Sequence, residues 1–200
     1  TIGVLVGMML FVAVIKESGM FEYVAIKSAK LVNADPWKMM VVFVIITAVL
    51  SSCLDNVTTV LLVGPMTIAI SNLLEVNPVP YLLMQILASN VGGTATLIGD
   101  PPNIMIGSAT GLTFLDFVKN TGGAVILVLI VQIVMMKFMY KKTITATEEA
   151  KAKVMALDEK KAITDLRLMK IGIGVIIYII VGFLLHDKLG IQSAVIALSA

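Results

Sequence analysis

Long apolar stretches alternate with short polar ones along most of this chain. Several stretches approach the roughly 20 apolar residues that a helix needs to cross a bilayer. The pattern predicts an all-α integral membrane protein, a polytopic helical bundle. We expect the tail of a spanning helix at 1–15, an interfacial segment at 16–38, a re-entrant helical hairpin at 39–74, a discontinuous transmembrane helix at 79–110, a span at 122–140, a cytoplasmic loop at 141–167, a span at 168–186 and the start of another at 190–200.

The hairpin is predicted from the length of residues 39–74, which are apolar except for the block Ser51–Thr59. One straight helix of this length would measure about 54 Å, whereas the hydrocarbon core of a bilayer is about 30 Å thick. Two complete spans joined at the polar block would each be short. We therefore predict that the segment enters and leaves on one face, with its polar tip buried in protein.

The discontinuous helix is predicted from glycines and prolines inside residues 79–110. Gly92 and Gly93 free the backbone, and Pro101 and Pro102 each remove a hydrogen-bond donor. We expect one helix to about Ala88, an unwound middle, and a second short helix from about Asn103.

Composition supports a membrane location. The chain is 58% hydrophobic and 14% charged, with a mean hydropathy of +1.01, whereas soluble domains are about 45–50% apolar and about 25% charged. The net charge of +2 is too small to indicate a nucleic-acid partner, and the single cysteine excludes an internal disulfide. Apolar runs at both ends predict an internal piece of a longer transporter.

The distribution of basic residues predicts the orientation. If residues 16–38 and 137–170 are cytoplasmic, only Lys119 and Lys188 of the 15 basic residues fall on the far side, as the positive-inside rule favours. This arrangement requires the 39–74 segment to return to its starting face and the 79–110 segment to cross once. We expect a plasma (inner) membrane protein with the 16–38 and 141–167 segments in the cytoplasm.

The two polar interruptions carry the candidate chemistry, and we expect them to face each other and to bind an ion or small solute. A carboxylate at membrane depth costs about 2.5–3.5 kcal/mol on insertion scales, so we expect Asp55 to contact a transported ion. A helix that ends at the hairpin tip offers carbonyl oxygens to a cation, and a helix that begins there offers N–H groups to an anion. The predicted substrate- and ion-binding residues are Ser52, Asp55, Asn56, Thr58, Thr59, Asn90, Gly92, Gly93, Thr94, Thr96, Asp100 and Asn103.

A coupling ion is the only cofactor that these residues suggest. Na⁺ would bind at Asp55, Asn56 and Gly93, and H⁺ would compete for the carboxylate, because desolvation raises a carboxyl pKa and a bound cation lowers it. Two structural alternatives remain open: Asp55 could merely cap the second hairpin helix, and Asp100 could merely start the helix after the break.

Two motifs carry a family resemblance. Residues 52–62 (SCLDNVTTVLL) and 90–103 (NVGGTATLIGDPPN) resemble the ion transporter superfamily, with its arsenite permeases, sodium–proton antiporters, P proteins, citrate carriers and divalent anion–sodium symporters. The motifs are most similar to the P-protein and arsenite-permease branch. Dicarboxylate symporters have Ser-Asn-Thr at the tip where this chain has Asp55-Asn56-Val57, and the added negative charge disfavours a dicarboxylate substrate.

The resemblance implies an elevator-type carrier, in which a transport domain moves against a homodimeric scaffold, and a pseudo-symmetric second half beyond this chain. The expected function is secondary active transport of a small inorganic or organic ion across a lipid bilayer, as an anion permease for arsenite, citrate or another anion coupled to Na⁺ or H⁺. The alternative is a sodium–proton antiporter. A channel is a third possibility. An intramembrane aspartyl protease is more remote, because Gly99-Asp100 lacks the glycine that precedes this pair in the protease motif. We do not expect an enzyme.

Overall fold

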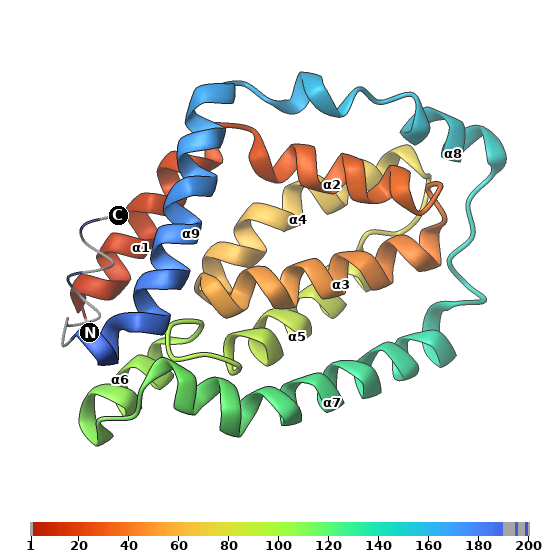
Figure 1. Cartoon of the computed structure of the whole chain (residues 1–200). Helices are drawn as coiled ribbons and strands as arrows, with labels where there is room; N and C mark the ends of the chain where they lie inside the picture. Colours follow the sequence, from red (N-terminus) through yellow and green to blue (C-terminus); the bar gives the residue numbers. More distant parts are fainter. Residues whose placement is uncertain (1, 190–194, 196–198, 200) are drawn as a thin grey trace.

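The computed structural model describes residues 2–189 together with Val195 and Ser199, and helices make up nearly all of this part, with no strand in it (Figure 1). The elements in chain order are α1 (Ile2–Lys16), α2 (Met20–Leu31), α3 (Pro36–Cys53), α4 (Asn56–Leu73), α5 (Val79–Gly93), α6 (Pro101–Thr110), α7 (Phe114–Tyr140), α8 (Glu148–Met155), the 3₁₀ helix η1 (Glu159–Ala162) and α9 (Leu166–Leu189). The expectation of an all-helical membrane protein is confirmed at this level. The span predicted at 190–200 lies outside the described residues, apart from Val195 and Ser199.

Helices α3 and α4 run in opposite directions and are joined at Leu54 and Asp55 (Figure 1). An aspartate caps the start of each helix: Asp35 accepts from Lys38 N at 2.9 Å, and Asp55 accepts from Thr58 N at 2.8 Å. Each helix has 18 residues and is therefore about 27 Å long. Because both are long and apolar enough to cross a membrane, the re-entrant form of this hairpin stays a prediction.

Helix α5 packs on α3, α4 and α7 and is the first of two helices in the 79–110 segment. It continues past Ala88 to Gly93, because the Thr94 N–H still donates to the Asn90 carbonyl at 3.2 Å. Residues 94–100 form no regular helix, and α6 then begins at Pro101, where a proline suits the first turn.

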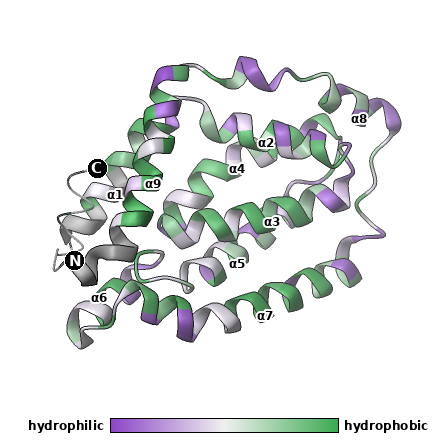
Figure 2. Ribbon diagram, viewed as in Figure 1, coloured by the Kyte–Doolittle hydropathy of each residue, from purple (hydrophilic) through white to green (hydrophobic). Residues whose placement is uncertain are grey.

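Helix α7 is the most exposed of the three candidate membrane spans among the described residues, and most of its residues are hydrophobic (Figure 2). It begins at Phe114, earlier than the predicted span at 122–140, because Thr113 and Asp116 form a reciprocal capping box. Helices α3, α4 and α7 are the three candidate membrane spans among the described residues.

The charged segment after α7 packs on the other basic segment of the chain. Lys30 of α2 pairs with Glu159 of η1 at 2.6 Å, and the Thr164 N–H donates to the Ser18 carbonyl at 3.1 Å. The 16–38 and 137–170 segments are thus neighbours in the fold. That both lie on one side of the membrane stays a prediction. Their cytoplasmic location and the interfacial placement of 16–38 stay predictions.

Two apolar cores stabilise the arrangement. One lies among α2, α3, α4, α5 and the charged segment. The other surrounds the joint between α3 and α4, where Leu54 is 4% exposed and packs in the same cluster as Leu97 and Ile98 of the 94–100 segment and Ile15 and Ile179 of α1 and α9. The second core holds the hairpin tip and the helix break together.

Candidate functional site

The tip of the α3–α4 hairpin meets the break between α5 and α6 (Figure 1). We call this meeting point the crossing, and define it by Ser51–Asn56 of the hairpin and Asn90–Asn103 of the break. Two glycines allow the close approach. A Cβ on Gly92 would lie 2.2 Å from the Ala48 carbonyl oxygen, and one on Gly93 would lie 2.1 Å from the Asn56 amide, so only glycine fits either position.

Asn56 is the central polar group of the crossing. Its amide nitrogen is best satisfied when it faces the carbonyl oxygens of Ser89, at 2.9 Å, and Gly99, at 3.2 Å. The amide groups of Asn56 and Asn90 are 3.2 Å apart. The buried Ser51 hydroxyl lies 2.7 Å from the Asn56 amide and donates to the Ser89 carbonyl at 2.7 Å. One side chain therefore connects α3, α4, α5 and the 94–100 segment.

A second set of hydrogen bonds closes the break against the hairpin. The Thr96 hydroxyl donates to the Ser52 carbonyl and accepts from the Gly99 N–H at 3.1 Å. From α6, the Asn103 amide donates to the Thr96 carbonyl at 2.9 Å. The same amide lies 3.4 Å from the Gly93 carbonyl oxygen, so the start of α6 is bound to the end of α5.

Four helix ends converge here: the C-terminal ends of α3 and α5 and the N-terminal ends of α4 and α6. Free carbonyl groups and the negative end of the helix dipole favour a cation, and free N–H groups with the positive end favour an anion. The crossing therefore offers both kinds of surface within one small volume, which is a chemical basis for binding two ions of opposite charge.

The two carboxylates of the crossing differ in their contacts. Asp55 is half-buried and caps α4, with one oxygen accepting from Thr58 N and the other from the Thr58 hydroxyl. The capping role considered from the sequence is thus observed, and each oxygen keeps further acceptor capacity. Asp100 occupies the N-cap position of α6, but its side chain makes no capping hydrogen bond.

The structure brings some of the predicted residues together and leaves others apart. Contacts between the hairpin and the break involve Ser52, Asn56, Asn90, Gly92, Gly93 and Thr96. Among the described residues, Asn103 bonds only within the break, to the carbonyl groups of Gly93, Thr94 and Thr96. Thr94 instead donates to Asn90 O of its own helix at 2.9 Å. Thr59 is fully buried, and its hydroxyl has no partner among the described residues.

Three contributors to the crossing were not predicted. The carbonyl groups of Ser89 and Gly99 face Asn56, and the hydroxyl of Thr121 on α7 donates to Thr94 O at 3.0 Å. Gly99 stands in the Gly-Asp-Pro-Pro run, which is a usable signal for close backbone approach. Backbone carbonyls and a threonine far along the chain leave no such signal.

The crossing contains no preformed cluster of acidic, histidine or cysteine ligands. In the described part of the chain, no three such side chains are grouped so that they could hold a metal ion. Any cation bound here would rely on carbonyl, amide and hydroxyl oxygens with at most the two carboxylates of Asp55 and Asp100, a ligand set that suits a hard cation better than zinc or iron.

The described residues form an all-helical architecture with three apolar candidate spans, which is that of a helical integral membrane protein. The sequence profile of a citrate transporter family matches residues 1–200, and the chain belongs to this family.

Similar curated proteins point the same way. An uncharacterized transporter of Mycobacterium tuberculosis is 44% identical over 195 residues, which is 97% of this chain and 45% of that protein. A second transporter of that species is 42% identical over 194 residues, again 97% of this chain and 45% of the relative. The human P protein is 39% identical over 145 residues, 70% of this chain and 17% of the relative. The chain thus spans less than half the length of these relatives.

Proposed function

We propose that the full protein is a secondary active transporter of a small ion, and that the crossing forms part of its binding site. The observation that carries the proposal is the contact between Asn56 and Gly93, which places the polar hairpin tip against the helix break. Family membership supports transport in general, and the geometry supports this location for the site.

The transported solute is proposed to be an anion, such as arsenite, citrate or another small anion. The N-terminal end of α4 supplies the N–H groups of Asn56 and Val57, which precede the bonded Thr58 N–H, and such groups bind anions without a basic side chain. Helix α6 contributes only its dipole, because it begins with two prolines and the next two N–H groups donate to the Asp100 carbonyl. Asn90 adds an amide donor, because its NH₂ group has a second hydrogen beyond the one bonded to the Ile86 carbonyl. The amide hydrogens of Asn56 and Asn103 already face carbonyl oxygens of the protein. A profile named for citrate transport agrees with an anionic substrate.

The coupling ion is proposed to be Na⁺ or H⁺, acting at Asp55. Na⁺ would contact Asp55, Asn56 and the Gly93 carbonyl region, where the ends of α3 and α5 direct carbonyl oxygens. Protons would compete for the same carboxylate, because protonation removes the charge that attracts Na⁺. Asp100 offers a second carboxylate that no capping bond occupies.

A sodium–proton antiporter is the second candidate function. The Asp55 carboxylate is half-buried and accepts hydrogen bonds from Thr58 of its own turn. This arrangement favours the antiporter, because one carboxylate can exchange Na⁺ for H⁺ without an anion. For either function we propose the re-entrant hairpin, the elevator motion, the homodimer and the plasma membrane location on the strength of the family resemblance.

Uptake into proteoliposomes containing the full-length protein tests these proposals. Arsenite, citrate and chloride would be offered under an imposed Na⁺ or pH gradient, with wild type compared with Asp55→Asn. The anion proposal expects gradient-driven uptake of one anion. Na⁺-driven proton efflux without anion uptake would establish the antiporter instead, and unchanged uptake and coupling in Asp55→Asn would remove Asp55 from the site.

A further inference from the structure

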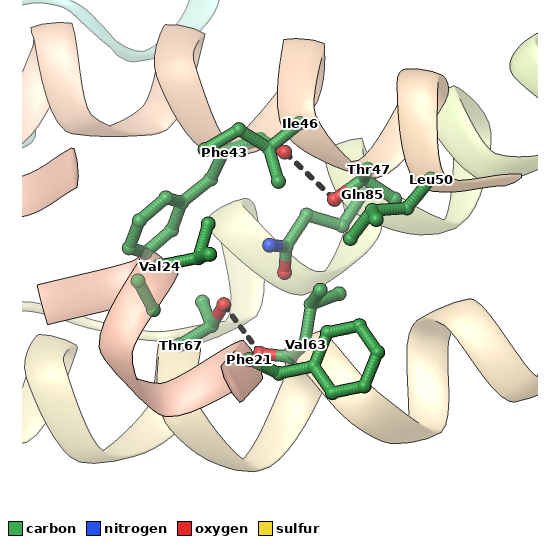
Figure 3. Close-up of a pocket in the computed structure, with 10 residues that line it drawn as sticks. Phe21, Val24, Phe43, Ile46, Thr47, Leu50, Val63, Thr67 and Gln85 are labelled. Carbon is green, nitrogen blue, oxygen red and sulfur yellow. Dashed lines mark hydrogen bonds between the residues drawn. The ribbon is translucent and has the colours of Figure 1, made fainter. Parts of the chain in front are cut away.

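A small cavity inside the bundle is separate from the crossing. It lies among α2, α3, α4 and α5 and is lined mainly by apolar side chains (Figure 3). Its polar lining residues are Thr47 of α3, Thr67 of α4 and Gln85 of α5. The cavity volume is about 20 Å³, which is enough for one water molecule.

Gln85 is the unusual residue of this cavity. It is 2% exposed, and its Oε1 atom has no hydrogen-bond partner among the described residues. Figure 3 shows its amide directed between the lining side chains of α3 and α4. A buried amide without partners is strongly unfavourable, and nearly all such groups in proteins are bonded to protein or to ordered water. The Oε1 atom of Gln85 therefore needs a partner that the described residues do not supply.

The two threonines complete a matching set of hydrogen-bonding groups. The Thr47 hydroxyl donates to Phe43 O at 2.7 Å, and the Thr67 hydroxyl donates to Val63 O at 2.9 Å. Since each hydroxyl hydrogen is already engaged, only the oxygen lone pairs remain as acceptors. With the oxygen and the NH₂ group of Gln85, the lining offers three acceptors and one donor group.

The charge of the lining decides what the ligand is. The residues that enclose the cavity include no acidic or basic side chain. A monovalent cation here would be a buried charge without a counter-charge, which is costly. Water is neutral, donates two hydrogen bonds and accepts two, and buried waters typically make about three bonds.

We propose that this cavity binds one water molecule, which bridges Gln85 of α5 to Thr47 of α3 and Thr67 of α4. The bridge joins both helices of the hairpin to the helix that carries Gly92 and Gly93. It is a hydration site within the apolar interior, and it does not depend on the identity of the transported ion.

Radiolytic labelling of the full-length protein tests the proposal. Hydroxyl radicals formed at a bound water oxidise neighbouring side chains that bulk water cannot reach. Phe43 lines the cavity and is 4% exposed, and Phe117 is a matched control that is 8% exposed and lies outside it. We expect Phe43 to be oxidised several-fold faster than Phe117 in wild type, and this excess to disappear in Gln85→Leu.

Equal labelling of Phe43 and Phe117 in wild type would show a dry cavity and overturn the proposal. This comparison needs no variant, so it stands even if Gln85→Leu fails to fold, and Thr67→Val provides a second variant in which the excess should fall. Thermal unfolding in NaCl and in choline chloride distinguishes water from a cation. A Na⁺-dependent rise in Tm that is lost in Gln85→Leu would make this a sodium site and would also overturn the proposal.

Discussion

The side-chain amide of Asn56 occupies the space that a side chain at Gly93 would need: a Cβ built on Gly93 would lie 2.1 Å from it and 2.8 Å from the Gly99 carbonyl oxygen. Atoms this close overlap, so the two positions are mutually dependent. An asparagine of the hairpin tip and a glycine of the helix break, far apart in the sequence, form a single contact.

Alanine at either glycine of the crossing should separate the hairpin from the break. We expect Gly92→Ala and Gly93→Ala each to destabilise the protein by about 1–3 kcal/mol, as overpacking does. Gly92→Ala should cost more, because its Cβ meets backbone atoms of Ala48. Both variants should lose most of their transport activity.

Gly122→Ala is the matched control, since nothing lies within 4 Å of a Cβ built there on α7. Alanine is also the better helix former, so its thermal stability in detergent should equal or exceed that of wild type. If all three variants unfold at the wild-type temperature, the close contact at the crossing does not exist.

Substitution at Asp55 should separate its structural role from its charge. Asparagine is as good an N-cap as aspartate, whereas alanine costs about 1 kcal/mol. We therefore expect Asp55→Asn to keep the wild-type Tm while losing the Na⁺ or pH dependence of transport, and Asp55→Ala to lose both. Thermal unfolding and proteoliposome flux on the same preparations check this expectation. An Asp55→Asn variant that keeps both the wild-type Tm and the wild-type Na⁺ or pH dependence of transport would leave capping as the whole role of Asp55.

Local chemistry made the ends of the helices predictable. Asp55 caps α4, and Pro101 starts α6, because both signals act within a single turn. The same signals located the hairpin joint and the helix break. The end of α5 was placed too early, at Ala88, because glycines at 92 and 93 allow an unwound chain without requiring one.

The contact between the two polar segments was predicted from the sequence, but the individual bonds that make it were not. The Thr96 hydroxyl bonds the Ser52 carbonyl across 44 positions, and backbone carbonyls look alike at every residue. Gln85 stands in an ordinary helical run, so neither its burial nor the cavity beside it could be read from composition. Pairing of this kind depends on how helices pack.

Tyr81 should contribute to the position of α5 on α3. Its hydroxyl donates to the Pro36 carbonyl at 2.8 Å, and the side chain is 1% exposed. We expect Tyr81→Phe to destabilise the protein by about 0.5–1.5 kcal/mol, the usual net value of one hydrogen bond. Tyr23→Phe is the control, because the Tyr23 hydroxyl contacts only Lys27 one turn away on the exposed surface of α2. Equal melting temperatures for the two variants would contradict the expectation.

The ion pair between Lys30 and Glu159 should make attachment of the charged segment to α2 dependent on pH. The hydrogen bond from Lys30 lowers the pKa of Glu159 below its ordinary value of 4.5. A carboxylate whose pKa is lower in the folded state stabilises that state above the unfolded pKa, and this contribution is lost as the pH falls through the lower, folded pKa. Hydrogen–deuterium exchange of residues 157–165 should therefore be slow and nearly constant above pH 5, and should accelerate at lower pH once intrinsic exchange is corrected for.

Glu159→Gln should show fast exchange at every pH. Glu148→Gln is the matched control, since Glu148 pairs with Lys151 within α8 at 2.7 Å and loses only a local contact. Similar exchange in the two variants would mean that the Lys30–Glu159 pair does not hold this segment in place.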